Sequence, residues 1–198
     1  MRPDLEIEGC RAAQELLDER LDGLDAGALR RPSLLPGWSV AHVLGHLVGN
    51  AESVVRRLRG VVEDRVADQY PRGEQGRADE IEALALLPRD ALLVAVRRSS
   101  AEVGAIFDEV PDEAWDRLSR SVSGKLLPAH LVVFSRWREV VVHHTDLGLG
   151  FSVAEWPPAL VSRWLPDALA GLPARTDPSA LLAWAIGRGP APEPEPWG

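Results

Sequence analysis

Three residues of this chain, His46, Glu139 and His143, have side chains of the types that hold a divalent metal ion. Glu139 and His143 are four positions apart, so a helix would present both on one face. His46 comes from a separate segment about ninety residues earlier. Two histidines and one carboxylate form the ligand set of a catalytic zinc site, where water or substrate takes the fourth position. A structural zinc site would more often be closed by four ligands that include Cys, and this chain has one Cys.

Two further histidines and one acid lie close enough in sequence to join or assist this site. His42 is one helical turn before His46 and could replace it as a ligand, whereas His144 points about 100° away from His143 around a helix. A surface position or a hydrogen bond to a ligand would also account for His42 and His144. Asp146 could orient a ligand imidazole or cap the end of the helix.

The remaining candidates are less closely tied to the site. His130 lies thirteen residues before His143 and is expected outside the coordination sphere. Cys10 has acidic neighbours and no nearby His in the sequence, which would not stabilise a thiolate. We interpret Cys10 as a small buried residue, so that any thiol chemistry here would use the thiol of a bound cofactor. A single Cys also excludes an intrachain disulfide.

The composition is that of a soluble globular protein, with 45% apolar and 26% charged residues in a chain of 198. No segment approaches the roughly 20 uninterrupted apolar residues of a membrane span, and we predict a cytoplasmic location. A net charge of −8 argues against nucleic acid as a partner. Nearly all the basic residues are arginines, which suit the bidentate binding of a small anionic substrate.

Apolar residues at helical spacing predict four long helices that position these side chains. The predicted helices are residues 3–24, 39–60, 79–107 with a break near Pro88, and 128–148. Ser39 is a suitable N-cap, polar residues 70–76 and the segment 111–124 read as loops, and Pro128 can sit in a first helical turn. Val140–Val142 would favour a strand in isolation, but the metal spacing requires a helix. Four helices with one long connection predict an antiparallel four-helix bundle.

Beyond Gly150 the composition shifts towards Pro, Trp and Ala. Residues 159–172 and 179–186 are predicted short helices, and residues 189–198 are a Pro-rich tail without periodicity. We therefore divide the chain into a metal-binding helical domain at residues 1–150 and a short C-terminal extension at residues 151–198.

Two segments resemble the mycothiol-dependent maleylpyruvate isomerase family, within the wider group of DinB-like metal-binding bundles. They are LPGWSVAHVLGHL at residues 35–47 and REVVVHHTDLGLG at residues 138–150. The resemblance continues through Tyr70-Pro71 and Trp156-Pro157-Pro158, and it covers most of residues 1–172. It implies an all-α, DinB-like four-helix bundle in which zinc is held by residues matching His46, Glu139 and His143.

The reaction that the resemblance implies is the cis–trans isomerisation of maleylpyruvate to fumarylpyruvate with the low-molecular-weight thiol mycothiol. Coordination to zinc would make the thiol a nucleophile at neutral pH. The thiolate would add to the conjugated double bond, the bond left single would rotate, and elimination would give the trans product. Arginines would hold the dicarboxylate and stabilise the developing enolate.

The chain departs from the family at its C-terminal end. Full-length relatives carry a second, smaller α/β domain, whereas about 48 residues follow Gly150 here and the strands expected between Arg175 and Ser179 are missing. The extension therefore reads as a truncated remnant of that domain. Arg188 matches a family arginine near the C-terminus that is implicated in catalysis. An exposed arginine at a helix end is the ordinary alternative.

Two other functions are compatible with the same residues. A mycothiol S-transferase would use the same addition to an electrophile without the elimination step. A non-catalytic metal-binding module would hold zinc and show no mycothiol-dependent rate.

Overall fold

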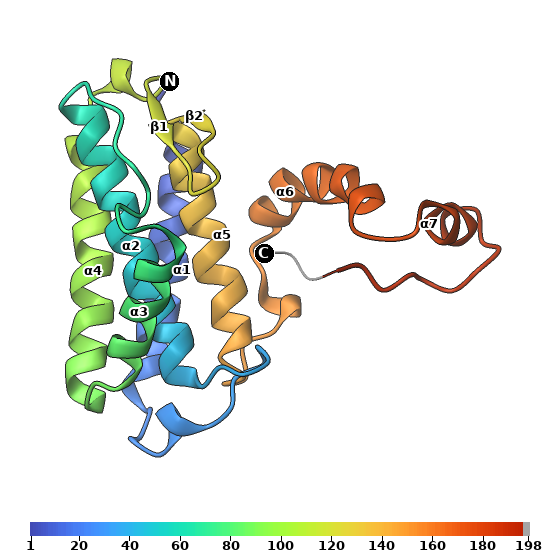
Figure 1. The fold of residues 1–198 in the computed structure, drawn as a ribbon, viewed down its shortest axis with the longest axis horizontal. Helices are drawn as coiled ribbons and strands as arrows, with labels where there is room; N and C mark the ends of the chain where they lie inside the picture. Colours follow the sequence, from blue (N-terminus) through green and yellow to red (C-terminus); the bar gives the residue numbers. More distant parts are fainter. Residues whose placement is uncertain (196–198) are drawn as a thin grey trace. The chain divides into compact units, whose positions relative to one another are not determined.

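The computed structural model describes residues 1–195, which are mainly α-helical, as the sequence predicts (Figure 1). The helices are α1 (Asp4–Asp22), α2 (Val40–Val62), α3 (Gly73–Ala85), α4 (Arg89–Glu109), α5 (His130–Asp146), α6 (Pro158–Gly171) and α7 (Pro178–Ala185). The chain divides into two compact units, Met1–Glu155 and a second that begins at Trp156. None of the helices within residues 1–195 combines the length and apolarity needed to cross a membrane.

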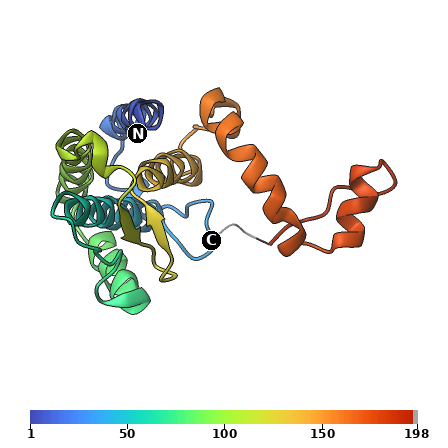
Figure 2. The same cartoon turned by 90° about the horizontal axis from the view of Figure 1, so that it is seen from above.

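The first unit is a four-helix bundle. Figure 2 shows its four long helices in cross-section in the order α1, α4, α2, α5, with α3 packed outside against α2. Each helix turns an apolar stripe inwards, and the largest fully buried side chains include Trp115, Trp137 and Phe107.

Neighbouring helices are not all antiparallel, which corrects the expectation from the sequence. Arg59, near the C-terminal end of α2, pairs with Glu109 at the C-terminal end of α4, so these two helices run in the same direction. Gly9 and Trp137, each in the first half of its helix, face one another between α1 and α5, which are also parallel. The α1–α4 and α2–α5 pairs are antiparallel.

The long connection between α2 and α4 explains the parallel pairs. It contains α3, which runs back along α2, so α4 begins at the same end of the bundle as α2. Gly45, near the start of α2, makes this packing close, because a Cβ there would lie 3.1 Å from Leu84 Cβ and 3.2 Å from the Ile81 carbonyl oxygen.

A buried arginine ties three of the bundle helices together. Arg136 of α5 is 2% exposed. Its guanidinium donates to the Leu47 carbonyl and Asn50 Oδ1 of α2, both at 2.9 Å, and to Gln14 Oε1 of α1 at 3.3 Å. Because removing an acceptor would leave a buried charge poorly satisfied, these bonds fix how α5 lies against α2.

Two predicted loops are shorter than the sequence suggests. A small antiparallel hairpin pairs β1 (Leu118–Arg120), which lies within the loop predicted at 111–124, with β2 (Leu126–Pro128), which follows that loop. Pro128 therefore ends a strand and does not enter the last helix, which begins at His130. The helical segment before Pro88, α3, begins at Gly73 within the predicted loop 70–76, where a φ of +66° suits glycine, and the long helix expected after Pro88 begins at Arg89 as α4.

The other predicted boundaries are confirmed to within a few residues. Ser39 directly precedes α2, and the three valines at 140–142 are helical within α5. In the second unit α6 and α7 match the predicted short helices, and no strand occurs within residues 156–195. Residues 189–195 have no regular structure, and the rest of the predicted tail, 196–198, lies outside the described residues.

The approach of α1 to α5 yields a stability prediction. A Cβ at Gly9 would lie 2.4 Å from Trp137 Cζ2, so Gly9→Ala should destabilise the bundle by about 1–3 kcal/mol through overpacking. Gly104→Ala is the matched control, since a Cβ there meets nothing within 4 Å and should stabilise α4 by about 0.5–1 kcal/mol. Denaturant unfolding of both variants measures the effect. A Gly9→Ala protein as stable as the parent would contradict this packing.

Candidate metal centre

The three predicted ligands come together between α2 and α5. His46 Nε2 lies 2.9 Å from Glu139 Oε2, and His143 Nε2 lies 3.4 Å from the same oxygen. One ligand atom from each residue falls within 4.8 Å of the other two. Among residues 1–195, this is the one group of three His, Cys, Asp or Glu side chains with such spacing.

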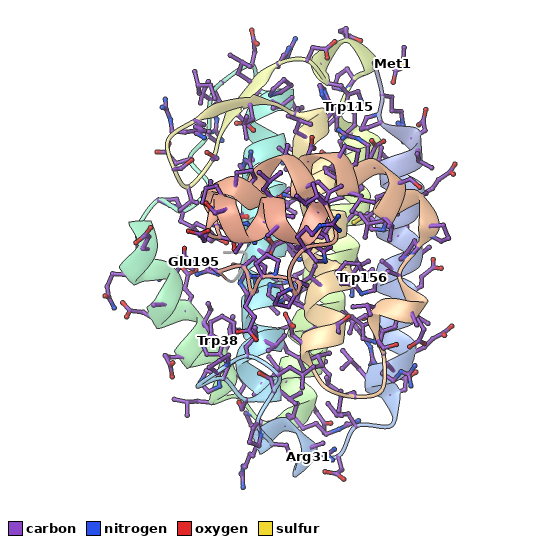
Figure 3. All side chains as sticks on the ribbon, turned by 90° about the vertical axis from the view of Figure 1, so that its right-hand side faces the viewer. Met1, Arg31, Trp38, Trp115, Trp156 and Glu195 are labelled. Carbon is purple, nitrogen blue, oxygen red and sulfur yellow. The ribbon has the colours of Figure 1, made fainter. Side chains whose placement is uncertain are left out.

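Local packing holds His46 in this position. Its side chain is buried, at 4% exposure, and the Trp38 ring lies 5.8 Å from the His46 ring between centroids. Trp38 belongs to the Pro/Gly loop that leads into α2, towards the end of the bundle opposite Trp115 (Figure 3). The His46 and His143 rings meet edge to face, with 4.5 Å between centroids.

Asp146 orients the second imidazole. Its Oδ2 accepts a hydrogen bond from His143 Nδ1 at 2.8 Å, which turns His143 Nε2 towards Glu139. A carboxylate on the outer nitrogen of a histidine is the usual support for a metal ligand. Of the two roles that the sequence leaves open for Asp146, the structure places its side chain in the orienting one.

The charges at the centre are strongly coupled. Burial would raise the pKa of Glu139, but hydrogen bonds from His143 and His46 outweigh burial and hold that pKa well below its usual range. Burial would lower the pKa of His143, but Asp146 and Glu139 raise it to about 9. Burial lowers the pKa of His46, which favours a neutral ring. His143 therefore takes positive charge beside two carboxylates.

A divalent cation fits this donor set. Two imidazole nitrogens and one carboxylate oxygen converge on one point, as in open zinc sites. The cation would compensate Glu139 and Asp146 with both imidazoles neutral, and Asp146 already accepts the outer proton of His143.

The outer nitrogen of His46 has a different neighbour. Arg77 Nη2 of α3 donates to His46 Nδ1 at 3.0 Å. Since a guanidinium can only donate, Nδ1 is the acceptor and the ring proton lies on Nε2, towards Glu139. Arg77 cannot be identified from the sequence, because a lone arginine in a polar segment carries no signal of the fold that brings it beside His46.

The neighbouring histidines do not act as ligands in this arrangement. The Ser39 backbone N–H donates to His42 Nδ1 at 3.2 Å, and the Ser39 hydroxyl lies 2.6 Å from the same nitrogen, so His42 belongs to the helix cap. His144 is buried and stacks on Phe151 with 4.0 Å between ring centroids. Its predicted alternatives, a surface position or support of a ligand, are therefore replaced by core packing.

The remaining candidates lie apart from the three ligands. His130 is at the opposite end of α5, where it contacts the Trp115 carbonyl. Cys10 is buried, and burial raises the pKa of its thiol to about 11, in agreement with a structural residue. Arg188 is an exposed residue after α7 in the second unit, so its catalytic role stays a prediction.

Solved structures share this fold. The crystal structure of the mycothiol-dependent maleylpyruvate isomerase matches with a TM-score of 0.86 at 20% identity, over 100% of this chain and 98% of that chain. A mutant of that isomerase gives the same values. YfiT from Bacillus subtilis, described as a probable metal-dependent hydrolase with an unusual four-helix bundle topology, matches at TM-score 0.59 and 16% identity, over 76% and 89%.

The sequence comparisons give the family. A comparison with curated proteins returns no match. The family model described as the mycothiol maleylpyruvate isomerase N-terminal domain matches residues 10–148, a span that contains all three converging side chains. Because this match covers well over half of the 198 residues, the chain belongs to the mycothiol maleylpyruvate isomerase family.

Proposed function

We propose that this protein is a zinc-dependent, mycothiol-using isomerase that converts maleylpyruvate to fumarylpyruvate. The observation that carries the proposal is the convergence of buried His46 with the partly buried Glu139 and His143, within the segment that matches the family model. The solved isomerases of the same fold support it. We assign the two histidines and Glu139 as the zinc ligands.

The chain's own residues would hold and orient the reacting groups. His46 Nε2, His143 Nε2 and a Glu139 oxygen would bind the ion, and Asp146 would keep the His143 ring in place by accepting its Nδ1 proton. A bound zinc ion would supply an acidified thiol, which is present as thiolate at neutral pH. Three protein ligands leave a coordination position free for that thiol.

The proposed reaction needs no net proton transfer. Bound mycothiol would supply a thiolate that could add to one carbon of the cis double bond, with the electron pair of that bond held on the adjacent carbonyl as an enolate. The bond left single could then rotate, and return of the electron pair would release the same thiolate and leave the trans acid.

The first test is catalytic. Purified protein with about one zinc per chain should convert maleylpyruvate to the trans product when mycothiol is present, and should show no enzymatic rate without it. Absorbance of the two isomers follows the reaction. Formation of a stable mycothiol conjugate with an added electrophile, without isomer turnover, would favour the S-transferase. Bound zinc with no thiol-dependent rate on any substrate would indicate a non-catalytic module.

The ligand assignment is tested by removing the shared carboxylate. Glu139→Gln keeps the size of the side chain but removes its charge, so the zinc content should fall from about one per chain to near zero after dialysis. Glu82→Gln, an exposed carboxylate beside His42, is the control and should retain zinc. Metal analysis of both proteins decides the matter, and full zinc in the Glu139→Gln protein would refute the assignment.

Removing the charge of Asp146 should weaken metal binding without abolishing it. Asp146→Asn replaces the charged acceptor on His143 Nδ1, and loss of such a partner typically weakens metal binding by about 10–100-fold. Competition with a zinc chelator measures the affinity. An affinity equal to that of the parent protein would show that Asp146 acts only in the helix end.

A further inference from the structure

A cavity of about 230 Å³ lies between α2 and the start of α3, in the first unit. It is lined by Arg56, Tyr70, Pro71, Arg72, Gly73, Gly76, Arg77 and Glu80. Pockets for drug-sized ligands are larger, about 300–1,000 Å³, so this volume suits a small molecule or one end of a longer one. Gly73 leaves open space beside the start of α3, whereas the Arg72 side chain packs against Gly76.

The charge in this cavity is unusual for a chain with a net charge of −8. Three guanidiniums and one carboxylate line it, and Arg72 is paired with the carboxylate of Glu80 at 2.7 Å. Arg56 donates to the backbone oxygen of Gln69 at 2.6 Å, and Arg77 donates to His46. Within residues 1–195, neither Arg56 nor Arg77 forms a close ion pair with a carboxylate, although the charge of Arg56 acts on nearby Glu52. The residues that line the cavity therefore carry more positive than negative charge.

Arg77 connects this cavity to the candidate metal centre. Its Nη2 is 3.0 Å from His46 Nδ1, while His46 Nε2 faces Glu139, so one imidazole ring separates the cavity from the ligand cluster. The Arg77 guanidinium also lies 5.8 Å from the centre of the Tyr70 ring, which holds it at the cavity wall.

The position of the His46 ring proton determines whether Arg77 can donate to a ligand in the cavity. A metal ion on Nε2 of a neutral His46 ring leaves the ring proton on Nδ1, where Arg77 can no longer donate. The guanidinium then needs another acceptor, and apart from the Tyr70 hydroxyl the side-chain acceptor among the lining residues is Glu80, which already pairs with Arg72. A carboxylate entering the cavity would supply two acceptor oxygens to a bidentate guanidinium.

We propose that this cavity binds a carboxylate group of the substrate, with Arg77 and Arg56 as its donors. The proposal rests on the proposed function, because it names the residues that would anchor the anionic end of the acid next to the metal centre. Arg72 keeps Glu80 neutralised, so that the carboxylate of Glu80 does not repel the ligand.

Equilibrium binding of succinate to the zinc-loaded full chain tests the proposal. Succinate is a small dianion that does not react with thiols, and isothermal titration in the absence of mycothiol measures its affinity without turnover. Arg77→Gln and Arg56→Gln should each weaken succinate binding at least tenfold. Arg98→Gln removes an exposed arginine that pairs with Glu102 outside the cavity, and it should bind succinate as the parent does. Succinamide, the neutral analogue, should not bind.

Several results would overturn the proposal: no succinate binding by the parent protein, equal binding of succinamide, or unchanged affinity in both cavity variants. Zinc content is measured in every sample. If Arg77→Gln loses zinc because Arg77 touches His46, Arg56→Gln decides, since Arg56 bonds to the Gln69 backbone. Succinate binding that depends on both arginines, in a protein without thiol-dependent turnover, would refute the isomerase and leave the carboxylate site standing.

Discussion

The buried carboxylate of Glu139 imposes the constraint on which the rest of this bundle depends. Its side chain is 17% exposed on a helix whose inward face is otherwise largely apolar, and an ionised carboxylate at such a position requires donors or a cation. His46 from α2 and His143 from the next turn of α5 meet that requirement at a single oxygen. The sequence can keep Glu139 only in a fold that brings these two helices together, antiparallel and at one relative height.

The position of α5 along α2 is fixed by the buried Arg136, which lies about one helical turn before Glu139. Its bonds to the Leu47 carbonyl and to Asn50 lock α5 against α2 beside His46. The same guanidinium reaches Gln14 of α1, so three helices share one polar cluster. A geometry suited to metal ligands therefore rests on hydrogen bonds that do not involve the ligands, and the site is pre-organised by the bundle core.

Local periodicity in the sequence encodes part of this structure. The four-residue spacing of Glu139 and His143, the cap at Ser39 and the break near Pro88 are local features, and the structure confirms them. Helix direction is not local, because an apolar stripe reads the same in parallel and antiparallel packing. The parallel pairs depend on the path of residues 63–88.

Other features of the structure are likewise not encoded by local patterns in the sequence. The hairpin strands have three residues each, too few to show an alternating pattern. The position of Arg77 follows from the packing of α3 on Gly45, which no spacing in the sequence reveals. The catalytic role of Arg188 stays a prediction, because the local pattern that predicts α6 and α7 does not place this residue relative to the three converging side chains.

Under the proposed ligand assignment, the separation of the ligands along the chain would couple metal supply to folding. His46 and Glu139 are 93 residues apart, so an ion held by both closes a long loop that the unfolded chain cannot maintain. Binding only to the folded form adds stability by mass action, about 2.7 kcal/mol when the free ion is a hundredfold above its dissociation constant. Without the ion, the bundle would rely on its apolar core and the Arg136 cluster alone. The lifetime of the folded protein in a cell would then depend on the availability of the metal.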